Sequence, residues 1–457
     1  MTDAKNIRIA YIGGGSMNFG WRLLGELAGE EALGGTVLLY DSDKTLALSN
    51  EVIGNRLREV PGCRSSFIYL AADTLEEALR DADFVLLSVT QGTLEELVSD
   101  IHLPEMFGIY QSTGESAGPG GIMRAVRTLP FYVKLAKTLQ KLCPKAWVIN
   151  LTSPMSVCLQ SLYRVFPAVK AVGCSCDPFS GQELLADLAG REWGIPQVHR
   201  RDIKVDLLGI PGFAWYNEAF YQGESLTALF RKYAEEYAAE GYERRPGEYK
   251  SNLSASANRV RFDLFLRYGL IAAQSDRQTA EFCPPWYLKN PKVAASWKFN
   301  LASVNPLRKR KVEQLARSRR LMNGEETLRI GPSGNDCVAQ IKALLGLGNL
   351  ITNADLPNEG QVSNLPNGCI VQTNALFSQN SVRPVTAGAL PDELCGLTLR
   401  QVYNQQTVLE SVLKKDLDIA FNAFLNDPLM TADLESATEL YREMLSSIRA
   451  HLIYYAE

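Results

Sequence analysis

The fold of this chain is decided by Ile7-Arg8-Ile9-Ala10-Tyr11-Ile12, which runs directly into Gly13-Gly14-Gly15-Ser16-Met17-Asn18. A short and nearly continuous apolar run of this kind is typical of a strand that is buried on both faces. The glycines predict a tight turn, and a helical pattern follows over residues 21–32. Strand, glycine turn and helix in this order indicate the start of a dinucleotide-binding unit.

Three more apolar runs continue the pattern along the first half of the chain. They cover Val37–Tyr40, Phe84–Val89 and Trp147–Asn150, and helical patterns over residues 75–80 and 130–142 precede the last two. Strands that alternate with helices predict a parallel sheet with helices on both faces. We therefore expect an α/β fold with a Rossmann-type doubly wound sheet.

The glycine turn is a candidate phosphate site. Gly-x-Gly after a first strand lets a pyrophosphate approach the backbone, and the following helix offers N–H groups and the positive end of its dipole. The third glycine of the usual fingerprint is missing, because Asn18 stands at its position. Asp41 ends the second strand, where an acid can bind the ribose hydroxyls of NAD and would repel the 2′-phosphate of NADP.

A glycine-rich turn without any ligand is the alternative, but the order of strand, turn, helix and acid favours NAD. The residues that we predict to bind NAD lie on this turn and at the ends of the following strands, and they are Gly13, Gly14, Gly15, Ser16, Met17, Asp41, Ser88 and Asn150.

After about residue 200 the pattern changes. A strand is expected over residues 204–210, and helices are expected over 226–241, 260–268, 307–322 and 431–455. A chain of 457 residues suggests two domains, since one domain takes about 100–200 residues. We predict an NAD-binding domain over residues 1–195, followed by a mixed α+β domain over 196–457 for substrate binding and oligomerisation.

Composition argues against several other classes of protein. Apolar residues make up 46% of the chain and charged residues 21%, and the formal net charge is -4, which suits a globular enzyme better than a disordered chain or a broad nucleic-acid-binding surface. The basic run Arg308-Lys309-Arg310-Lys311 is interpreted as a solvated helix face. We expect no membrane span and no signal peptide. The nine cysteines are scattered without Cys-x-x-Cys pairs, which favours the reducing cytoplasm.

Five segments carry a resemblance to a known family. The chain resembles glycoside hydrolase family 4, NAD-dependent glycosidases with the lactate/malate dehydrogenase type of fold, and it is most similar to the alpha-galacturonidase-like branch. The resemblance rests on Ile9–Ser16, Gln111-Ser-Thr-Gly-Glu-Ser-Ala-Gly-Pro-Gly-Gly121 with Arg124 and Arg127, Asn150-Leu-Thr-Ser-Pro154, Phe262–Asp276, and Asn358–Gln361 with Asn364–Pro366.

The resemblance implies an unusual hydrolysis. In this family NAD oxidises the sugar at C3, a tyrosine removes the acidified C2 proton, the glycosidic oxygen leaves, and water adds before C3 is reduced again. The family is an exception to the paired-carboxylate mechanism of most glycosidases. The hydride chemistry belongs to the cofactor, which the protein orients.

The resemblance also implies catalytic residues. Tyr268 falls where the family has its base, although a residue of this kind at a helix end could equally serve only in packing. Asp276 lies at a position that is usually acidic, and its alternative is an ion pair with Arg277. If the alignment is shifted by one residue, Asp177 directly follows the ligand position Cys176 and falls where some members have their general acid.

The departures from the family concern its divalent metal, which is often manganese. The family holds the ion with a cysteine and a histidine, but the corresponding positions here are Ser175, or Cys176 after a one-residue shift, and Gly212. A single remaining ligand does not hold manganese tightly. We therefore expect no metal site, with Cys176 as the one candidate ligand.

Four polar residues are predicted to bind the sugar. Gln278 replaces a histidine of the family and Ser153 replaces an asparagine, and both are expected at the substrate together with Ser175 and Arg124. Arg127 could hold an anion, serve the cofactor or form a structural ion pair.

Three functions remain open at this point. The first, which we favour because Tyr268 and Asp276 are retained, is an NAD-dependent glycosidase that acts without a metal on a small glycoside, neutral or anionic. The second is an NAD-dependent sugar oxidoreductase, and the third is a catalytically silent protein that binds NAD or sugar. A homo-oligomer, either dimer or tetramer, is expected, with no nucleic-acid or membrane partner.

Overall fold

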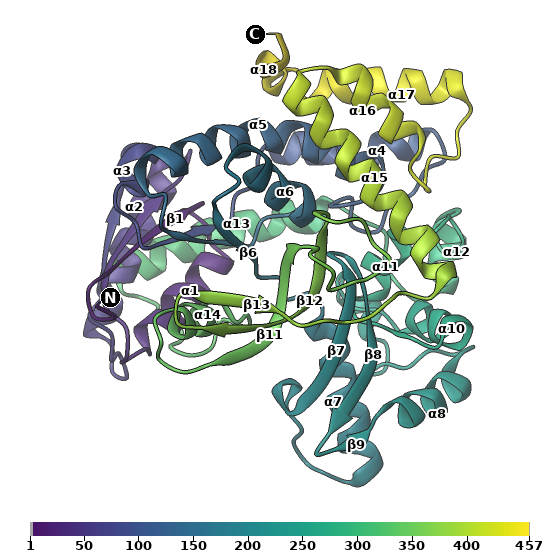
Figure 1. Cartoon of the computed structure of the whole chain (residues 1–457), viewed down its shortest axis with the longest axis horizontal. Coiled ribbons are helices and arrows are strands. Elements are labelled where there is room, and N and C mark those ends of the chain that lie inside the picture. The colour runs from purple at the N-terminus through teal and green to yellow at the C-terminus, as the bar shows by residue number, and fades with distance from the viewer. Residues whose placement is uncertain (1–2, 457) are drawn as a thin grey trace.

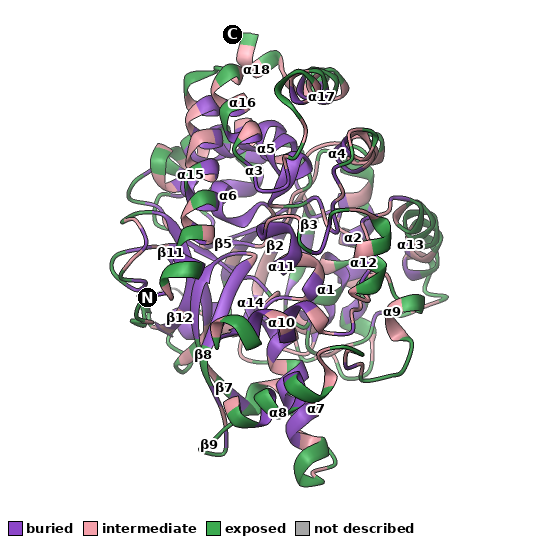
Figure 2. Ribbon diagram, turned by 90° about the vertical axis from the view of Figure 1, so that its right-hand side faces the viewer, coloured by how far each residue is buried: buried purple, intermediate pink, exposed green. Residues whose placement is uncertain are grey.

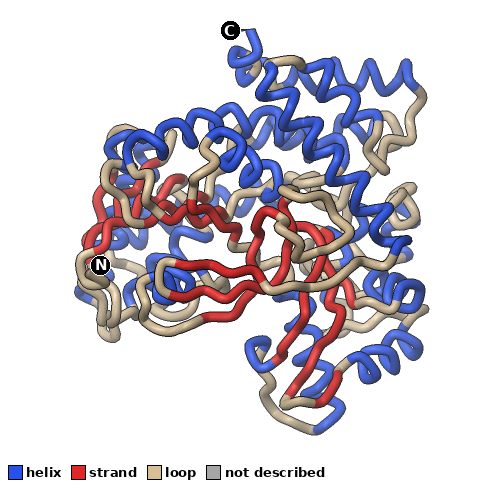
Figure 3. The backbone as a smooth tube through the Cα atoms, viewed as in Figure 1, coloured by secondary structure: helices blue, strands red, loops and turns tan. Residues whose placement is uncertain are grey.

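The computed structural model describes residues 3–456, and a long mixed sheet runs through it (Figures 1 and 3). The strands of this sheet are β1 (Ile7–Ile12), β2 (Gly35–Tyr40), β3 (Ile68–Ala71), β4 (Phe84–Leu87), β5 (Trp147–Asn150), β6 (Lys170–Gly173), β11 (Leu350–Pro357), β12 (Ile370–Ser378) and β13 (Ser381–Pro384). Within the described residues their spatial order is β13-β12-β11-β6-β5-β4-β1-β2-β3.

The six strands from β1 to β6 are parallel and confirm the predicted Rossmann-type sheet. Their order, with β3 and β2 on one side of β1 and β4 to β6 on the other, is that of dinucleotide-binding sheets. The sequence analysis missed β3 and β6. The reason is that β3 lies at the sheet edge, where its side chains alternate between exposed and buried, while β6 has only four residues and includes Lys170 and Gly173.

The second half of the chain extends the same sheet. Strand β11 is antiparallel to β6, with Asp355 opposite Gly173, and β12 and β13 add two further antiparallel strands. Residues beyond 350 therefore complete a sheet that begins at Ile7. The division of the chain near residue 195 stays a prediction, and it does not coincide with an edge of this sheet.

A smaller antiparallel sheet lies beside the main one and is built from β7 (Ile203–Ile210), β8 (Phe213–Tyr221), β9 (Glu224–Ser225) and β10 (Ile271–Ala272). Strand β7 confirms the strand expected over residues 204–210. It joins β8 through a two-residue turn, Pro211-Gly212. This turn faces the carboxyl ends of the parallel strands, so the smaller sheet contributes one wall of the pocket described below.

Helices cover both faces of the main sheet and fill the space around the smaller one (Figure 1). They are α1 (Phe19–Ala28), α2 (Lys44–Arg56), α3 (Leu75–Leu79), α4 (Leu94–Met106), α5 (Gly118–Leu142), α6 (Met155–Val165), α7 (Phe179–Trp193), α8 (Thr227–Tyr237), α9 (Glu248–Ser251), α10 (Arg259–Tyr268), α11 (Asp276–Phe282), α12 (Pro291–Ser296), α13 (Asn305–Asn323), α14 (Cys337–Leu344), α15 (Asp392–Lys414), α16 (Leu417–Leu425), α17 (Leu434–Ser447) and α18 (Ile453–Ala456).

Two helices differ from their predicted extents. Helix α5 begins at Gly118 instead of near Pro130, because Pro119 suits a first helical turn and the helix accommodates Pro130 in its interior. The last helical pattern, expected over residues 431–455, divides into α17 and α18. There the chain bends toward α5, and the Tyr455 hydroxyl donates a hydrogen bond of 2.8 Å to the carbonyl of Val126.

Burial follows this layered arrangement, with the strands and the inner faces of the helices buried and the outer helices exposed to solvent (Figure 2). Helix α13, which carries the basic run, is almost entirely on the surface, as expected of a solvated face. Among residues 3–456, no helix combines the length and the apolar character needed to cross a bilayer. All nine cysteines are free thiols.

Candidate active site

The glycine turn between β1 and α1 is packed so closely that larger residues do not fit. Gly13 has a φ of +90°, and a Cβ atom there would lie 2.0 Å from the Ser88 carbonyl oxygen at the end of β4. A Cβ at Gly15 would lie 2.8 Å from Asp41 Oδ2. The sequence therefore needs glycine here to bring the turn onto the ends of β2 and β4.

Asp41 is attached to this turn. Its Oδ2 accepts a 2.9 Å hydrogen bond from the Gly15 N–H, and its Oδ1 accepts one of 3.0 Å from Asp43 N–H. Close helix packing, which the missing third glycine would allow, is provided by Gly20, where a Cβ would lie 3.4 Å from the Tyr11 hydroxyl. Gly20 was not predicted for this role, because the usual spacing of the fingerprint places the third glycine at Asn18.

The N-terminus of α1 can receive an anion. Its N-cap residue Asn18 makes no side-chain capping bond, and its first turn has no acidic residue. The first N–H groups of a helix have no partner within the helix. Apart from the Gly20 N–H, which donates to Ser16 Oγ at 3.2 Å, they and the helix dipole are available to a phosphate. Of the other predicted cofactor residues, Ser16 accepts a hydrogen bond from Gly20 N–H, and the Met17 carbonyl accepts one from Gln314.

Asn150 lies beneath this region and is fully buried. Its Oδ1 accepts a 2.6 Å hydrogen bond from the Tyr132 hydroxyl, and its Nδ2 donates to the Thr152 carbonyl at 3.1 Å. The structure thus uses its side chain to hold the turn after β5.

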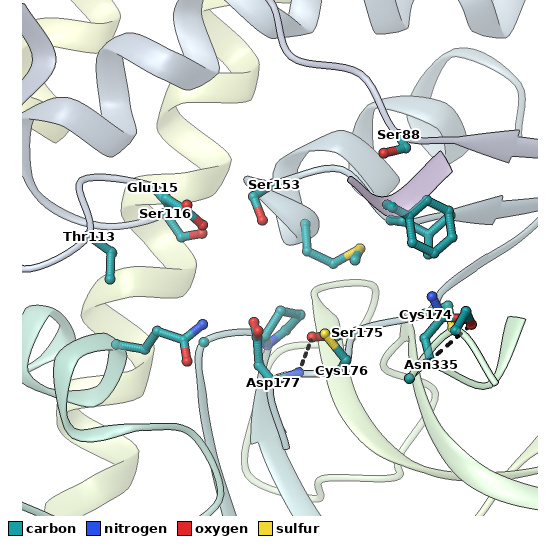
Figure 4. A pocket seen from close by; sticks show the side chains of 18 of the residues that line it. Ser88, Thr113, Glu115, Ser116, Ser153, Cys174, Ser175, Cys176, Asp177 and Asn335 are labelled. Carbon is teal, nitrogen blue, oxygen red and sulfur yellow. Dashed lines mark hydrogen bonds between the residues drawn. The ribbon is translucent and has the colours of Figure 1, made fainter. Parts of the chain in front are cut away.

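A pocket opens beside the glycine turn, at the carboxyl ends of β4, β5 and β6 (Figure 4). This is where open α/β sheets bind their ligands. It is lined by Phe19, Arg22, Ser88, Thr113, Glu115, Ser116, Leu151, Ser153, Met155, Cys174, Ser175, Cys176, Asp177, Pro211, Gly212, Gln278, Phe282, Ser333, Gly334 and Asn335. The structure therefore brings together Ser88, Ser153, Ser175, Asp177 and Gln278, which were predicted from different parts of the chain.

Asp177 is a carboxyl group in the pocket whose surroundings favour its protonated form. Burial raises its pKa above the ordinary value, and the negative charge of Glu115 acts in the same direction, while a hydrogen bond from Gln278 lowers it. Its backbone N–H donates to Ser175 Oγ at 3.2 Å. A carboxyl with a raised pKa keeps its proton closer to neutral pH, which suits a general acid.

Glu115 is a second pocket acid, and sequence reasoning missed it although it lies within the quoted segment Gln111–Gly121. It is carried by a loop that the buried carboxylate of Glu281 holds through the N–H groups of Thr113 at 2.5 Å and Gly114 at 2.9 Å. Glu281 and Gln278 both belong to α11, so one helix positions two walls of the pocket. The signal available in the sequence was an acid within a glycine-rich motif.

The two predicted arginines lie behind this loop. Arg124 is not part of the pocket lining, and its Nη1 is 3.9 Å from Glu115 Oε1. Arg127 forms a nearly fully buried ion pair with Asp100 at 2.5 Å, which is the structural alternative named for it. The assignment of Arg124 to substrate binding stays a prediction. To bind the sugar, its guanidinium would have to reach the pocket beyond Glu115.

Tyr268 and Asp276 are not brought into the pocket. Tyr268 ends α10 and packs edge-on against Trp215, with ring centroids 6.5 Å apart; burial raises the pKa of its phenol and the Arg267 guanidinium lowers it. Asp276 is fully buried, and its oxygens accept hydrogen bonds from the N–H groups of Arg261 at 3.1 Å and Val260 at 3.3 Å, in the first turn of α10. It contacts neither the pocket nor the Arg277 side chain named as its alternative partner.

The donors at the pocket do not fit a manganese site. Of the two expected ligand positions only Cys176 carries a donor group, and a single ligand does not hold manganese tightly. Gly212 has a φ of +87°, and a Cβ there would lie 2.6 Å from the Phe282 ring, so a larger ligand has no room. Among residues 3–456, no group of three His, Cys, Asp or Glu side chains could hold a metal ion.

Comparison with known proteins identifies the family. The sequence matches the description "Family 4 glycosyl hydrolase" over residues 8–190 and "Family 4 glycosyl hydrolase C-terminal domain" over residues 207–430. The chain belongs to glycoside hydrolase family 4. It is therefore a glycosidase, and the resemblance seen in its motifs is confirmed.

Several members of family 4 are similar over the whole chain. An alpha-galacturonidase of Thermoanaerobacterium saccharolyticum is 47% identical, with 99% of this chain and 98% of that protein covered. The crystal structure of a putative glucosidase, LplD, from Bacillus subtilis is 43% identical, with a TM-score of 0.92 over 96% of this chain and 100% of that one. A 6-phospho-beta-glucosidase from Thermotoga maritima, solved with manganese, NAD+ and glucose-6-phosphate, shares the fold at 20% identity, with a TM-score of 0.77 over 97% of this chain and 99% of that one.

Proposed function

We propose that this chain hydrolyses α-linked galacturonides with NAD as its cofactor and without a catalytic metal. Four relatives named alpha-galacturonidase, between 42% and 47% identical over 98–99% of the chain, support the substrate class. The observation that carries the proposal is the position of Asp177, a partly enclosed carboxyl, in a pocket that adjoins the glycine turn.

The residues around the glycine turn fit NAD. Gly13 and Gly15 bring the turn close to the ends of β4 and β2, the N-terminus of α1 is turned to the pyrophosphate position with no acidic residue in its first turn, and Asp41 stands at the end of β2 for the ribose hydroxyls. When bound, NAD supplies reversible hydride transfer with C3 of the sugar. Ser88, Ser153 and Ser175 line the adjoining part of the pocket, where hydroxyl groups can orient the sugar by hydrogen bonds.

Asp177 is assigned as the general acid. Protonation of the glycosidic oxygen needs a proton that is still present at neutral pH and lies within reach of the leaving group. The enclosure of Asp177 and the charge of Glu115 both favour the protonated carboxyl. For the C2 proton, the family resemblance implies Tyr268, whereas the carboxylate on the pocket wall is Glu115. The two are distinguished by the variants given in the Discussion.

Without a metal, negative charge that develops on the C3 oxygen needs hydrogen-bond donors. The hydroxyls of Ser153 and Ser175 and the amide of Gln278 are available on the pocket wall. Donors that are preorganised around a developing oxyanion contribute about 2.7–4 kcal/mol each in hydrolytic enzymes, so two of them could take the place of an ion.

The test is an assay of the purified chain on 4-nitrophenyl α-galacturonide, with and without NAD and in the presence of a chelator or added manganese. We expect hydrolysis that requires NAD, survives the chelator, and incorporates deuterium from the solvent at C2 of the product. Net formation of NADH with an oxidised sugar would identify an oxidoreductase instead. Activity that is lost with chelator and restored by manganese would refute the metal-free mechanism. The predicted homo-oligomer and cytoplasmic location remain predictions.

A further inference from the structure

Arg22 is a charged pocket residue for which the chemistry above has no use. It belongs to α1, and its side chain lines the pocket beside the turn Ser333-Gly334-Asn335. Its Nη1 lies 3.8 Å from the position that a Cβ of Gly334 would take. The side chain is exposed, and within residues 3–456 its guanidinium forms no ion pair and no hydrogen bond.

The other arginines around the pocket are engaged. Arg127 pairs with Asp100, and Arg124 faces Glu115. Arg200 and Arg201 both pair with Asp336, at 3.2 Å and 3.0 Å. Arg22 is therefore the one cation on the described pocket wall whose donors are free, and it shares that wall with two acids, Glu115 and Asp177.

A uronic acid entering this pocket brings a third carboxylate into partly enclosed space. Burying an unpaired charge beside other negative charges is strongly unfavourable, whereas a guanidinium binds a carboxylate through two parallel hydrogen bonds. Asn335 follows Gly334 in the turn that Arg22 approaches, and it lines the same pocket. Its Oδ1 accepts from the N–H of Cys337 at 3.0 Å, and its Nδ2 makes no hydrogen bond within the described residues. A guanidinium and a free amide N–H₂ on one wall form a donor set that suits a carboxylate.

We propose that Arg22 binds the carboxylate of the uronic-acid substrate and sets the preference for a uronide over a neutral hexoside. This inference rests on the proposed function and names the residue that gives it specificity. Arg22 belongs to the first turn of α1, where the pyrophosphate of NAD would also lie, so NAD is the competing ligand that the test must separate from the sugar. Arg22 lines the same pocket as Asp177 and Gln278, the residues assigned to the sugar.

Binding measurements test this inference independently of turnover. Calorimetry of the chain with NAD present would give the affinity for galacturonate and for galactose in the wild type, Arg22→Gln and Arg22→Lys. We expect Arg22→Gln to weaken galacturonate binding about 100-fold, as for loss of one partner of a desolvated charge pair, and to leave galactose binding within about threefold. Arg22→Lys should fall between the two, because it keeps the charge and loses the bidentate geometry.

The matched control is Arg319→Gln, which removes one positive charge from the exposed face of α13, outside the pocket. It should change neither sugar affinity. An unchanged preference in Arg22→Gln would overturn the inference, and so would an equal loss of NAD affinity, which would assign Arg22 to the cofactor. If the wild type selects galacturonate through Arg22 but hydrolyses no galacturonide, the proposed function fails while the carboxylate site stands.

Discussion

Asp355 offers a quantitative test of the structure because it is a buried acid with only one of its oxygens engaged. It lies in β11 with no exposed surface. Its Oδ1 accepts a 2.7 Å hydrogen bond from Gln372 Nε2, while Oδ2 has no partner. Gln372 in turn accepts a 2.7 Å hydrogen bond from Gln274. A buried oxygen without a donor disfavours the charged carboxylate much more than the neutral acid.

Burial is the main cause that raises the pKa of Asp355 from 3.8 to about 7; the charge of Asp177 adds to it, and the Gln372 hydrogen bond opposes it. The folded chain therefore keeps this proton at pH values where the unfolded chain has lost it. The stability of the folded state then falls as the pH rises above 3.8, and the fall is complete near pH 7. Over about three pH units, at about 1.4 kcal/mol for each, this amounts to about 4 kcal/mol.

Replacement of Asp355 by asparagine should remove this penalty. The amide oxygen can accept the same bond from Gln372, and the neutral side chain has no charge to bury. A chain of 457 residues has an unfolding entropy of roughly 1 kcal/mol per kelvin. We therefore expect the melting temperature of Asp355→Asn to rise relative to that of the wild type by about 4 °C between pH 4 and pH 8, with most of the change below pH 7.

The assay is thermal unfolding of both proteins at matched pH, together with the infrared carbonyl band of a protonated buried acid. The band should be lost near pH 7 in the wild type and be reduced in Asp355→Asn. Asp336 provides a control of opposite sign. Its pKa is lowered although burial would raise it, because Thr352 and two arginines bind its charge. Asp336→Asn should lower stability at pH 7, with the deficit shrinking as the pH falls through its lowered pKa. A melting difference for Asp355→Asn that does not change with pH would refute the reasoning.

Three further predictions concern the site. Asp41→Ala should reduce the preference for NAD over NADP and loosen the Gly15 turn that it binds; calorimetry giving the wild type equal affinity for both cofactors would contradict its role. Asp177→Asn should lower kcat by about 10²–10⁴ without loss of NAD binding, unless another group supplies the proton. Because Glu115 lines the pocket and Tyr268 does not, Glu115→Gln should abolish deuterium exchange at C2, and Tyr268→Phe should retain turnover near that of the wild type; the reverse result would restore Tyr268 as the base.

The parallel half of the fold could be predicted because its strands are buried on both faces and therefore appear as apolar runs. Strands β11 and β12 gave no such signal. They place Asp355, Gln372 and Thr373 in the interior, where hydrogen bonds across the sheet compensate for their polarity. No local pattern distinguishes such residues from those of an exposed loop, so their place in the main sheet depends on pairing with a strand formed much earlier in the chain.

The pocket lining was predictable at Asp177, Ser153 and Gln278, which lie at or beside positions of family motifs. It was not predictable where a residue acts through another. Glu281 holds the loop of Glu115 from a position more than 160 residues later, and nothing in its own neighbourhood indicates that role. Asp276 was predicted to be catalytic from its position in the family resemblance; its oxygens accept hydrogen bonds in the first turn of α10, and its catalytic role stays a prediction.

The other end of the Glu115 loop shows why the pocket cannot be assigned to the first half of the chain alone. Helix α5 begins directly after this loop, and its N-cap residue Ala117 has no side chain that could accept a hydrogen bond. The fully buried carboxyl of Asp427 takes that place, since its Oδ2 accepts a 3.0 Å bond from the Gly118 N–H and its Oδ1 accepts one of 2.9 Å from Leu429. A cap of this kind stabilises a helix start by about 0.5–2 kcal/mol.

Glu281 and Asp427 thus fix both ends of a loop that brings Thr113, Glu115 and Ser116 to the pocket. Because both acids come from the second half of the chain, a fragment ending near residue 195 would keep the glycine turn but lose the groups that hold Glu115 opposite Asp177.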